Sequence, residues 1–379
     1  MPAQGQARAK KIPTSSRRST PGPKPVPAPF DLAHHIITFD REDASTFSPH
    51  TLPPAAAMAA EARKPIPWPA DATPTPKPLA RTPSPDAKLP QCDYVIVTWT
   101  VEEAKALADT LTPGFPSKTA WYHYAHKFES EYVPLIRRGA PALESKRLAS
   151  YFVTTIGEKQ VLCMKSELHL SQDGQAMPIA KLWKQIIDEA KPKLIITTGT
   201  AGGIGAEIEL GDVVTAESVR FDCLRSFKSK PFHNAIYKCS RLKSTSNATA
   251  EKLFAANADH LPAGKRLPRI YTKSVAAAKV PDVVTTDFFA FDDKSNTFAL
   301  QGLGAAVEMG DAVLGMVIQE MGASAPLWAA IRNASDPQID DTGLTIKEAG
   351  TKAAQIYEKF GYWTTIPSAI ACWAAVKDN

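Results

Sequence analysis

The pattern of apolar and polar residues changes near residue 90. Beyond this point, short β-branched runs alternate with amphipathic stretches, whereas the first 90 residues show neither pattern. Apolar runs that alternate with helical patterns are typical of an α/β domain with a largely buried sheet. We therefore expect one α/β domain over residues 91–379, in which helices flank a central mixed β-sheet.

The same pattern predicts individual elements. Strands are expected at 94–98, 151–156, 160–165, 194–198, 212–219, 274–278, 282–286 and 326–332. Helices are expected at 101–111, 178–190, 310–321, 345–359 and 366–376. The clearest helix begins at Pro178, because the apolar residues from Ile179 to Ala190 recur at helical spacing and proline fits a first helical turn.

Proline is concentrated before the domain, where residues 1–90 hold 19 of the 32 prolines. Proline at this density removes amide donors and restrains each preceding residue, so neither helix nor sheet can propagate. Residues 1–90 are therefore expected to form a disordered tail rich in Pro and Ala. The exception is HHIITF at 34–39, a short apolar island that could dock on the domain.

The net charge of +5 belongs to this tail. Residues 1–90 hold 12 Lys and Arg against 7 Asp and Glu, whereas residues 91–379 hold 32 of each sign. A neutral domain lacks the basic signature of nucleic-acid binding, so no specific nucleic-acid partner is expected.

No apolar run is long enough to span a membrane. The five scattered cysteines, without C-x-x-C, indicate reduced thiols in a cytoplasmic protein rather than disulfides or a metal site.

The most distinctive string is TGTAGGIG at 198–205, directly after an expected buried strand. Glycines here let the backbone approach a ligand, with amides free to bind an anion or a sugar oxygen. The string also fits the dinucleotide turn of short-chain dehydrogenases. That turn must open a helix, whereas this one leads through AEIELGDVV into another strand, and no tyrosine is followed by lysine four positions later. The dehydrogenase interpretation is therefore rejected.

In its longer form, LIITTGTAGGIGAEIELGDVVTAESV at 194–219 resembles the central segment of the nucleoside phosphorylase and nucleosidase superfamily. That segment has a strand, G-[ST]-A-G-G, a short loop and G-D-V-V. Further landmarks follow the family's order: VIVTWTVEEAKAL (95–107), TTDFFAFDD (285–293), AAVEMGDAVLG (305–315) and IRNASD (331–336). The first is similar to the opening strand and helix of methylthioadenosine/S-adenosylhomocysteine nucleosidases. The resemblance, over roughly 93–376, implies cleavage of a purine nucleoside's N-glycosidic bond, without metal or organic cofactor, by a homo-oligomer.

The resemblance also implies roles for single residues. Asp336 matches the aspartate that protonates the purine, and Glu103 matches the glutamate that activates the attacking water, with Glu102 in solvent beside it. The other matches would bind substrate: Thr200, Ala201 and Gly202 near the water or phosphate, Phe289 on the base, Met309 under the ribose, and Ser335 beside the aspartate. In the alternative interpretation, Asp336 caps a turn, Glu103 is a surface residue and Phe289 packs in the core.

One position departs from the family. The residue after Met309 is expected to be a glutamate that binds the ribose hydroxyls, and here it is Gly310. Losing a charged hydrogen bond costs about 1.5–3 kcal/mol. Glu308 and Asp311 flank the gap, and either would need a local shift to replace the missing carboxylate. The protein could hold ribose differently, accept a modified sugar or have lost catalysis.

The group that attacks the sugar could be water or phosphate. Phosphorylases of the family carry an early G-D-P-x-R loop for phosphate, and this chain reads WTVEEA there instead, which favours water. The preferred function is a purine nucleosidase. The alternatives are a phosphate-dependent phosphorylase, with Arg137, Arg138 or Arg220 as anion ligands, and a catalytically degenerate nucleotide-sensing module. His169 or Gln172, in a segment where the family has a ligand loop, could face the sugar.

Overall fold

The computed structural model describes residues 31–48, 62–243, 245–262, 266–272 and 283–379. The strands are β1 (Thr75–Pro76), β2 (Tyr94–Thr98), β3 (Tyr122–Tyr124), β4 (Ala149–Ile156), β5 (Lys159–Ser166), β6 (Leu194–Gly203), β7 (Val213–Thr215), β8 (Ser218–Phe221), β9 (Ile236–Lys238), β10 (Ile270–Tyr271), β11 (Val283–Thr285), β12 (Ala306–Glu308) and β13 (Leu327–Asp336). The helices are α1 (Leu32–Thr38), α3 (Val101–Leu111), α4 (Pro141–Ser145), α5 (Pro178–Ala190), α6 (Asn247–Phe254), α7 (Asp311–Met321) and α8 (Ile346–Asp378). Single helical turns lie at Ala44–Thr46, Ala70–Ala72, Phe128–Tyr132, Val133–Leu135, Ala258–His260 and Gly322–Ser324.

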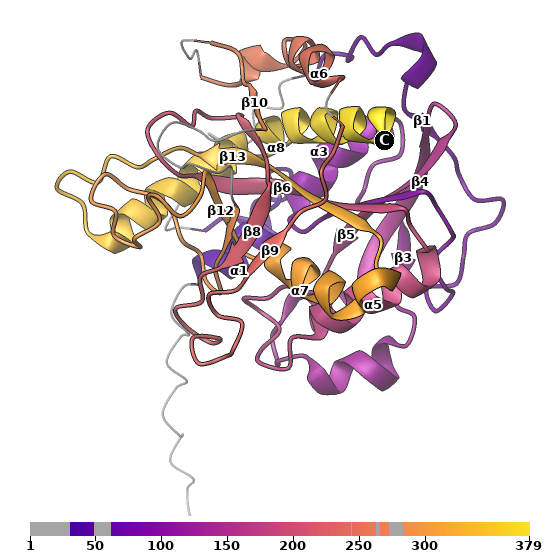
Figure 1. The fold of residues 1–379 in the computed structure, drawn as a ribbon, viewed down its shortest axis with the longest axis horizontal. Helices are drawn as coiled ribbons and strands as arrows, with labels where there is room; N and C mark the ends of the chain where they lie inside the picture. Colours follow the sequence, from indigo (N-terminus) through magenta and orange to yellow (C-terminus); the bar gives the residue numbers. More distant parts are fainter. Residues whose placement is uncertain (1–30, 49–61, 244, 263–265, 273–282) are drawn as a thin grey trace, which may run out of the picture. The chain divides into compact units, whose positions relative to one another are not determined.

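The strands form one mixed sheet (Figure 1), whose main path runs β1-β4-β5-β2-β6-β12-β11-β8-β9. Strand β6 is its centre, because it pairs in parallel with β2 and β13 and its last residues pair antiparallel with β12. The carboxyl ends of β2, β6 and β13 therefore meet at one edge. In open α/β sheets this is the edge where ligands bind.

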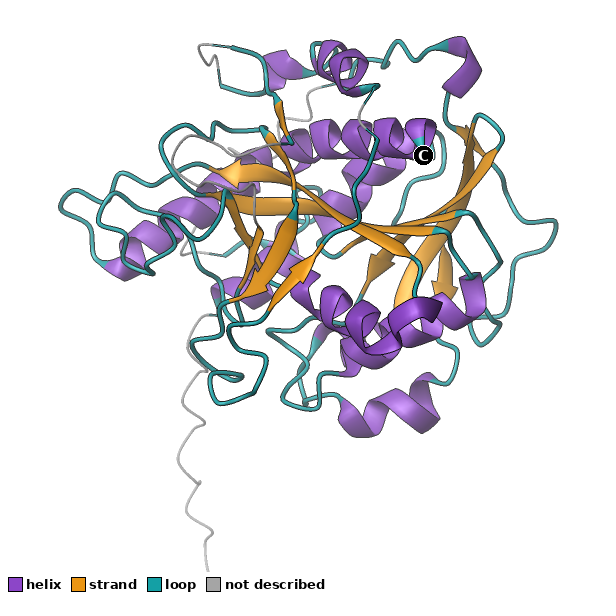
Figure 2. Cartoon of the chain, viewed as in Figure 1, coloured by secondary structure: helices purple, strands orange, loops and turns teal. Residues whose placement is uncertain are grey.

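Helices cover both faces of the sheet (Figure 2). Successive side chains of a strand point to opposite faces, and β2 shows the result. Val95 and Val97 pack in the apolar core shared with α5 and α7, whereas Tyr94 and Ile96 pack in the core shared with α3 and α8. The expected fold, a central mixed sheet flanked by helices, is confirmed.

Several elements differ in extent from the sequence-based expectation. The strand expected at 212–219 is two strands, β7 and β8, and β6 continues through the glycines to Gly203. The helices expected at 345–359 and 366–376 are one helix, α8, with Pro367 inside it. Burial of most side chains of α8 from Gly361 to Val376 outweighs the cost of an internal proline. The strand expected at 274–278 lies outside the described residues.

The expectation of disorder up to Pro90 is wrong for residues 32–48 and 62–90. HHIITF docks as proposed, since α1 buries Ile36 and the next turn buries Phe39 against α8. Farther along, Ile66 is buried, and the Trp373 indole donates a hydrogen bond of 2.6 Å to the Ala72 carbonyl. Scattered apolar side chains thus find places on the domain, and an extended proline-rich backbone needs few amide donors to lie there. Residues 1–30 and 49–61 lie outside the described residues.

Two kinds of structure are absent from the described ranges. No helix there is long and apolar enough to cross a membrane. No three His, Cys, Asp or Glu side chains in those ranges are grouped as a metal site would require. All five cysteines fall in the described ranges, and four of them, Cys92, Cys163, Cys223 and Cys372, are buried thiols.

The docking of residues 62–72 can be tested through stability. We predict that Ile66→Ala lowers the free energy of unfolding by about 2–5 kcal/mol, because it removes a buried side chain and leaves a cavity. Leu344→Ala is the matched control, since Leu344 is 37% exposed, and its effect should stay within about 0.5 kcal/mol. Urea unfolding of both variants gives the comparison. Equal stabilities would show that the segment does not pack on the domain.

Candidate active site

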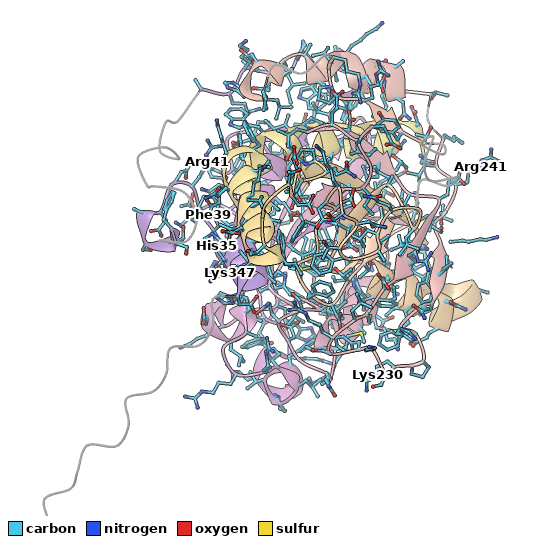
Figure 3. All side chains as sticks on the ribbon, turned by 90° about the vertical axis from the view of Figure 1, so that its left-hand side faces the viewer. His35, Phe39, Arg41, Lys230, Arg241 and Lys347 are labelled. Atoms are coloured by element: carbon cyan, nitrogen blue, oxygen red, sulfur yellow. The ribbon has the colours of Figure 1, made fainter. Side chains whose placement is uncertain are left out.

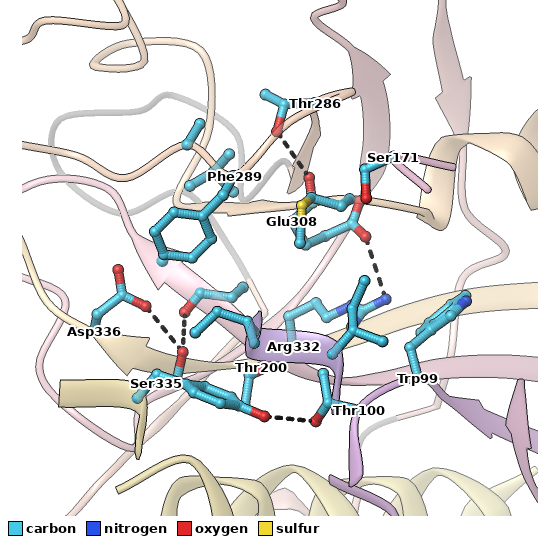
Figure 4. A pocket seen from close by; sticks show the side chains of 18 of the residues that line it. Trp99, Thr100, Ser171, Thr200, Thr286, Phe289, Glu308, Arg332, Ser335 and Asp336 are labelled. Atoms are coloured by element: carbon cyan, nitrogen blue, oxygen red, sulfur yellow. Dashed lines mark hydrogen bonds and ion pairs between the residues drawn. The ribbon is translucent and has the colours of Figure 1, made fainter. Parts of the chain in front are cut away.

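A single cavity, drawn in Figure 4, collects most of the residues singled out from the sequence. It lies at the carboxyl ends of β2, β6 and β13. The expected residues that line it are Glu103, His169, Thr200, Ala201, Gly202, Phe289, Glu308, Met309, Ser335 and Asp336. The lining residues that were not expected include Ile36, Ile37, Trp99, Thr100, Ser171, Thr286, Arg332 and Tyr357. Asp311 does not line the cavity.

Glu103 is placed by the start of helix α3. Thr100 is the N-cap, and its hydroxyl accepts a hydrogen bond of 3.2 Å from the Glu103 amide. In return, Glu103 Oε2 accepts from the Thr100 amide at 2.9 Å, which completes a capping box. The same oxygen also accepts from the Trp99 amide at 2.9 Å and the Thr98 hydroxyl at 2.5 Å. Glu103 is therefore a buried residue of the site, not a surface glutamate.

The second oxygen of Glu103 reaches the glycine-rich strand. Oε1 accepts from the amide of Thr200 at 2.7 Å and from its hydroxyl at 2.5 Å. Gly199, with φ +127°, passes so close that a Cβ at this position would overlap the Glu103 carboxylate. The glycine thus lets β6 approach the carboxylate, which is the use of glycine that the string TGTAGGIG suggested.

Glu102, expected in solvent, is buried instead and 1% exposed. Its Oε1 accepts a hydrogen bond of 3.0 Å from the Arg41 amide and lies 3.3 Å from Lys105 Nζ. The segment that follows α1 covers this side chain. Glu102 was expected in solvent because that segment was expected to be part of a disordered tail. Burial raises the pKa of Glu102.

Asp336 reaches the cavity at the end of β13. The pairing of β13 with β6 shifts register between Ala334 and Asp336, which marks a bulge at Ser335. Neighbouring residues of a regular strand point to opposite faces, but here Ser335 and Asp336 both line the cavity. The Ser335 hydroxyl donates a hydrogen bond of 2.9 Å to Asp336 Oδ1. Burial raises the pKa of Asp336 to about 7, and this one hydrogen bond only partly opposes the rise.

Arg332 is buried and lies on β13 as well, before Asp336 in the strand. Its guanidinium forms a two-pronged ion pair with Asp311, with Nε 2.8 Å from Oδ2, and lies 3.4 Å from Glu308 Oε2. It also stacks on the Trp99 ring at 4.8 Å from the ring centre. Asp311 therefore faces Arg332 rather than the cavity. Among the described residues that line the cavity, Arg332 is the one Lys or Arg, and two carboxylates already pair with it.

The structure around Gly310 shows why no carboxylate projects there. Gly310 is the N-cap of α7, and Glu308 Oε2 accepts from its amide at 2.5 Å and from the Asp311 amide at 3.1 Å. A Cβ on Gly310 would lie 3.3 Å from the Trp99 ring, so the indole takes part of the space that a glutamate would need. Burial, followed by the charge of Asp311, raises the pKa of Glu308.

Three buried polar atoms of the lining have no hydrogen-bond partner among the described residues. They are Trp99 Nε1, His169 Nε2 and Ser171 Oγ. Burial lowers the pKa of His169 to about 3, so its imidazole is neutral at physiological pH. The His169 and Ser171 side chains can exchange hydrogen bonds with a ligand. Gln172, the other residue suggested from this segment, does not line the cavity.

Some of the lining residues that were not expected lie within the sequence landmarks, and others carry no sequence signal. Arg332 belongs to the R-x-x-S-D string and could have been assigned with Asp336. Trp99 lies within the first landmark, but nothing in one sequence relates it to Gly310. Ile36 and Tyr357 are far apart in the chain and carry no motif, so only the packing of α1 on α8 reveals that both reach the cavity.

Several solved structures align with about three quarters of this chain. Futalosine hydrolase of Helicobacter pylori strain 26695 aligns with 76% of this chain and 97% of its own, at 15% identity and a TM-score of 0.45. The 5′-methylthioadenosine/S-adenosylhomocysteine nucleosidase of Helicobacter pylori, solved with butyl-thio-DADMe-Immucillin-A, aligns with 76% of this chain and 99% of its own, at 16% identity and a TM-score of 0.46.

Sequence comparisons agree with the landmarks. A curated 5′-methylthioadenosine/S-adenosylhomocysteine nucleosidase of Listeria innocua is 30% identical over 94 residues. That match spans 24% of this chain and 37% of the relative's length. The family model described as the phosphorylase superfamily matches residues 93–360, which is most of the domain. Because this match covers more than half of the chain, the chain belongs to the phosphorylase superfamily.

Proposed function

We propose that this protein hydrolyses the N-glycosidic bond of a purine nucleoside, with Asp336 as the general acid and Glu103 as the group that activates water. The observation that carries the proposal is a pair of buried carboxyls that line one cavity. One has a pKa raised to about 7, and the other accepts five hydrogen bonds. Carboxyls in such different environments suit opposite roles in acid–base catalysis.

The departing purine needs a proton. As the C1′–N9 bond breaks, its electron pair moves into the purine ring, and a ring nitrogen must be protonated for the base to leave. A carboxyl with a pKa near 7 is substantially protonated at neutral pH and can donate that proton. The bulge at Ser335 turns the Asp336 carboxyl into the cavity, where a purine could lie against Phe289.

Both carboxyls lie against the same short stretch of β6. Glu103 is bonded to Thr200, and a Cβ on Gly202 would lie 3.1 Å from Asp336 Oδ2. The acid and the water-activating group proposed here therefore face one cavity from a single segment of the glycine-rich strand.

Thr200 gives that water access to Glu103. Four of the five donors on the carboxylate are backbone amides or the buried Thr98 hydroxyl, and the fifth is the hydroxyl of the less buried Thr200. Rotation of this hydroxyl frees Oε1 to accept a proton from water. The water oxygen then bonds to C1′, its proton goes to Glu103, and the purine leaves with the proton of Asp336.

The charges of the cavity favour water over phosphate. A phosphate dianion needs cations that are free to bind it, whereas Arg332 is already paired with Asp311 and Glu308. Arg137, Arg138 and Arg220 are not among the lining residues. Phosphorolysis therefore remains the second candidate function. For the sugar hydroxyls, the unpaired His169 and Ser171 are the candidate partners in place of the missing glutamate.

The proposed activity can be tested directly on a panel of nucleosides. We predict that the purified protein releases free base from at least one of 5′-methylthioadenosine, S-adenosylhomocysteine, adenosine and inosine in phosphate-free buffer. Liquid chromatography of the released base gives the rate. Release that strictly requires phosphate would favour the phosphorylase. Retained nucleoside binding with no release would favour a sensing module.

The role of Asp336 predicts both a mutant effect and a pH dependence. Asp336→Asn removes the proton donor and should lower kcat by roughly 10²–10⁴-fold. In the wild type, kcat/KM should fall as pH increases through about 7, because the ionised carboxyl cannot donate a proton. In Asp336→Asn, kcat/KM should not show this fall as pH increases through about 7.

Asp340→Asn is the control for this variant. Asp340 is exposed, and its ion pair with Lys294 is on the surface, so its replacement should leave the pH profile unchanged. A wild-type profile in Asp336→Asn would contradict the assignment of the acid.

A further inference from the structure

Helix α1 forms part of the cavity wall although it precedes the family's matched region, residues 93–360. Ile36 and Ile37, two adjacent residues of this helix, both line the cavity. They are 4% and 3% exposed, so the cavity and the neighbouring helices enclose them almost completely. The domain's own segments therefore do not complete the site alone.

Several independent contacts hold α1 and the following turn in place. His35 Nε2 lies 2.6 Å from Glu358 Oε1 on α8, and both residues are buried. Phe39 is fully buried and packs edge-on against Tyr357, the α8 residue whose hydroxyl donates to Thr100 at 2.8 Å. Figure 3 shows His35, Phe39 and Arg41 side by side along α8. The helix is thus joined to the residues that cap α3.

The turn after α1 is anchored on α3 itself. Asp40 pairs with Lys105 and, at 3.0 Å, with Lys118, while the Arg41 amide donates to Glu102. Glu102 is the neighbour of Glu103 in the first turn of α3. The segment that carries the two isoleucines is therefore fixed to the element that positions the water-activating carboxylate.

The wall that α1 contributes is apolar. A charged group placed against Ile36 and Ile37 would lose its hydration without gaining a partner. The one lining cation among the described residues, Arg332, is occupied by two carboxylates. An uncharged apolar group would instead gain from burial there.

The cavity leaves about 60 Å³ of free space between the side chains that line it. A ligand that binds there would therefore contact the lining side chains closely, including Ile36 and Ile37 of α1.

We propose that α1 is a substrate-binding wall of the active site and that Ile36 and Ile37 select nucleosides without a charged substituent. The inference rests on the proposed function for the identity of the ligand as a nucleoside. The role of α1 as a binding wall rests on the cavity itself.

Kinetics on two substrates test the selection. The wild-type kcat/KM for 5′-methylthioadenosine should exceed that for S-adenosylhomocysteine, which carries a charged amino-acid tail, by at least about 10-fold. Replacing both isoleucines, as Ile36→Ala with Ile37→Ala, should reduce that ratio at least about 5-fold, mainly by raising KM for 5′-methylthioadenosine. Leu32→Ala is the matched control, because Leu32 is on the same helix but does not line the cavity; its ratio should equal the wild-type ratio. An unchanged ratio in the double variant would overturn the selective role.

Hydrogen exchange separates this inference from the proposed function. With Asp336→Asn, which keeps the cavity but should turn over slowly, saturating 5′-methylthioadenosine is expected to slow amide exchange in residues 33–39. Protection on β6 and β13 without protection in 33–39 would overturn the role of α1 and leave the function intact. If residues 33–39 are protected but the wild-type protein cleaves no nucleoside, the proposed function is refuted and the role of α1 as a binding wall stands. No protection anywhere would contradict both.

Discussion

The carboxylate of Glu103 is the interaction on which the site depends. It accepts hydrogen bonds from the turn between β2 and α3 and from Thr200 on β6, so one side chain joins two parallel strands and the start of a helix. A buried charge without partners would be strongly destabilising, and five donors offset that cost. The close approach also explains Gly199, since any side chain there would overlap the carboxylate.

The two catalytic candidates differ because their surroundings differ. Asp336 receives one side-chain hydrogen bond, and burial raises its pKa to about 7, whereas Glu103 is surrounded by donors. Arg332 is balanced by Asp311 and Glu308 and adds little free positive charge to the cavity. The cavity thus combines two buried carboxyls in different surroundings with an apolar wall that includes α1. These features are the basis of the proposed cleavage of a neutral glycosidic bond by water.

Local sequence signals predicted the parts of the structure that depend on neighbours in the chain. The strand Tyr94–Thr98 and the helix Val101–Leu111 follow from their own residues, and both have the expected bounds. The landmark strings also placed nearly all expected site residues in one cavity. Asp311 was the exception, because its partner Arg332 lies on a strand that is distant in sequence.

The features that could not be predicted depend on tertiary packing. Ile36 reaches the cavity only because α8 offers a surface for α1, and proline content alone suggested disorder up to Pro90. Pro367 lies inside a helix because burial outweighs the local preference. The contact between Trp99 and Gly310 joins two landmarks, and neither string contains a sign of the other.

The most direct test of the account is the first sugar product formed from a β-configured purine nucleoside in the presence of inorganic phosphate, followed by proton NMR. Attack by a water held near Glu103, on the face opposite the departing base, predicts free sugar that appears first as the α-anomer. A sugar 1-phosphate, or the β-anomer as the first product, would contradict the assignment of water, Glu103 and Asp336 to a single displacement.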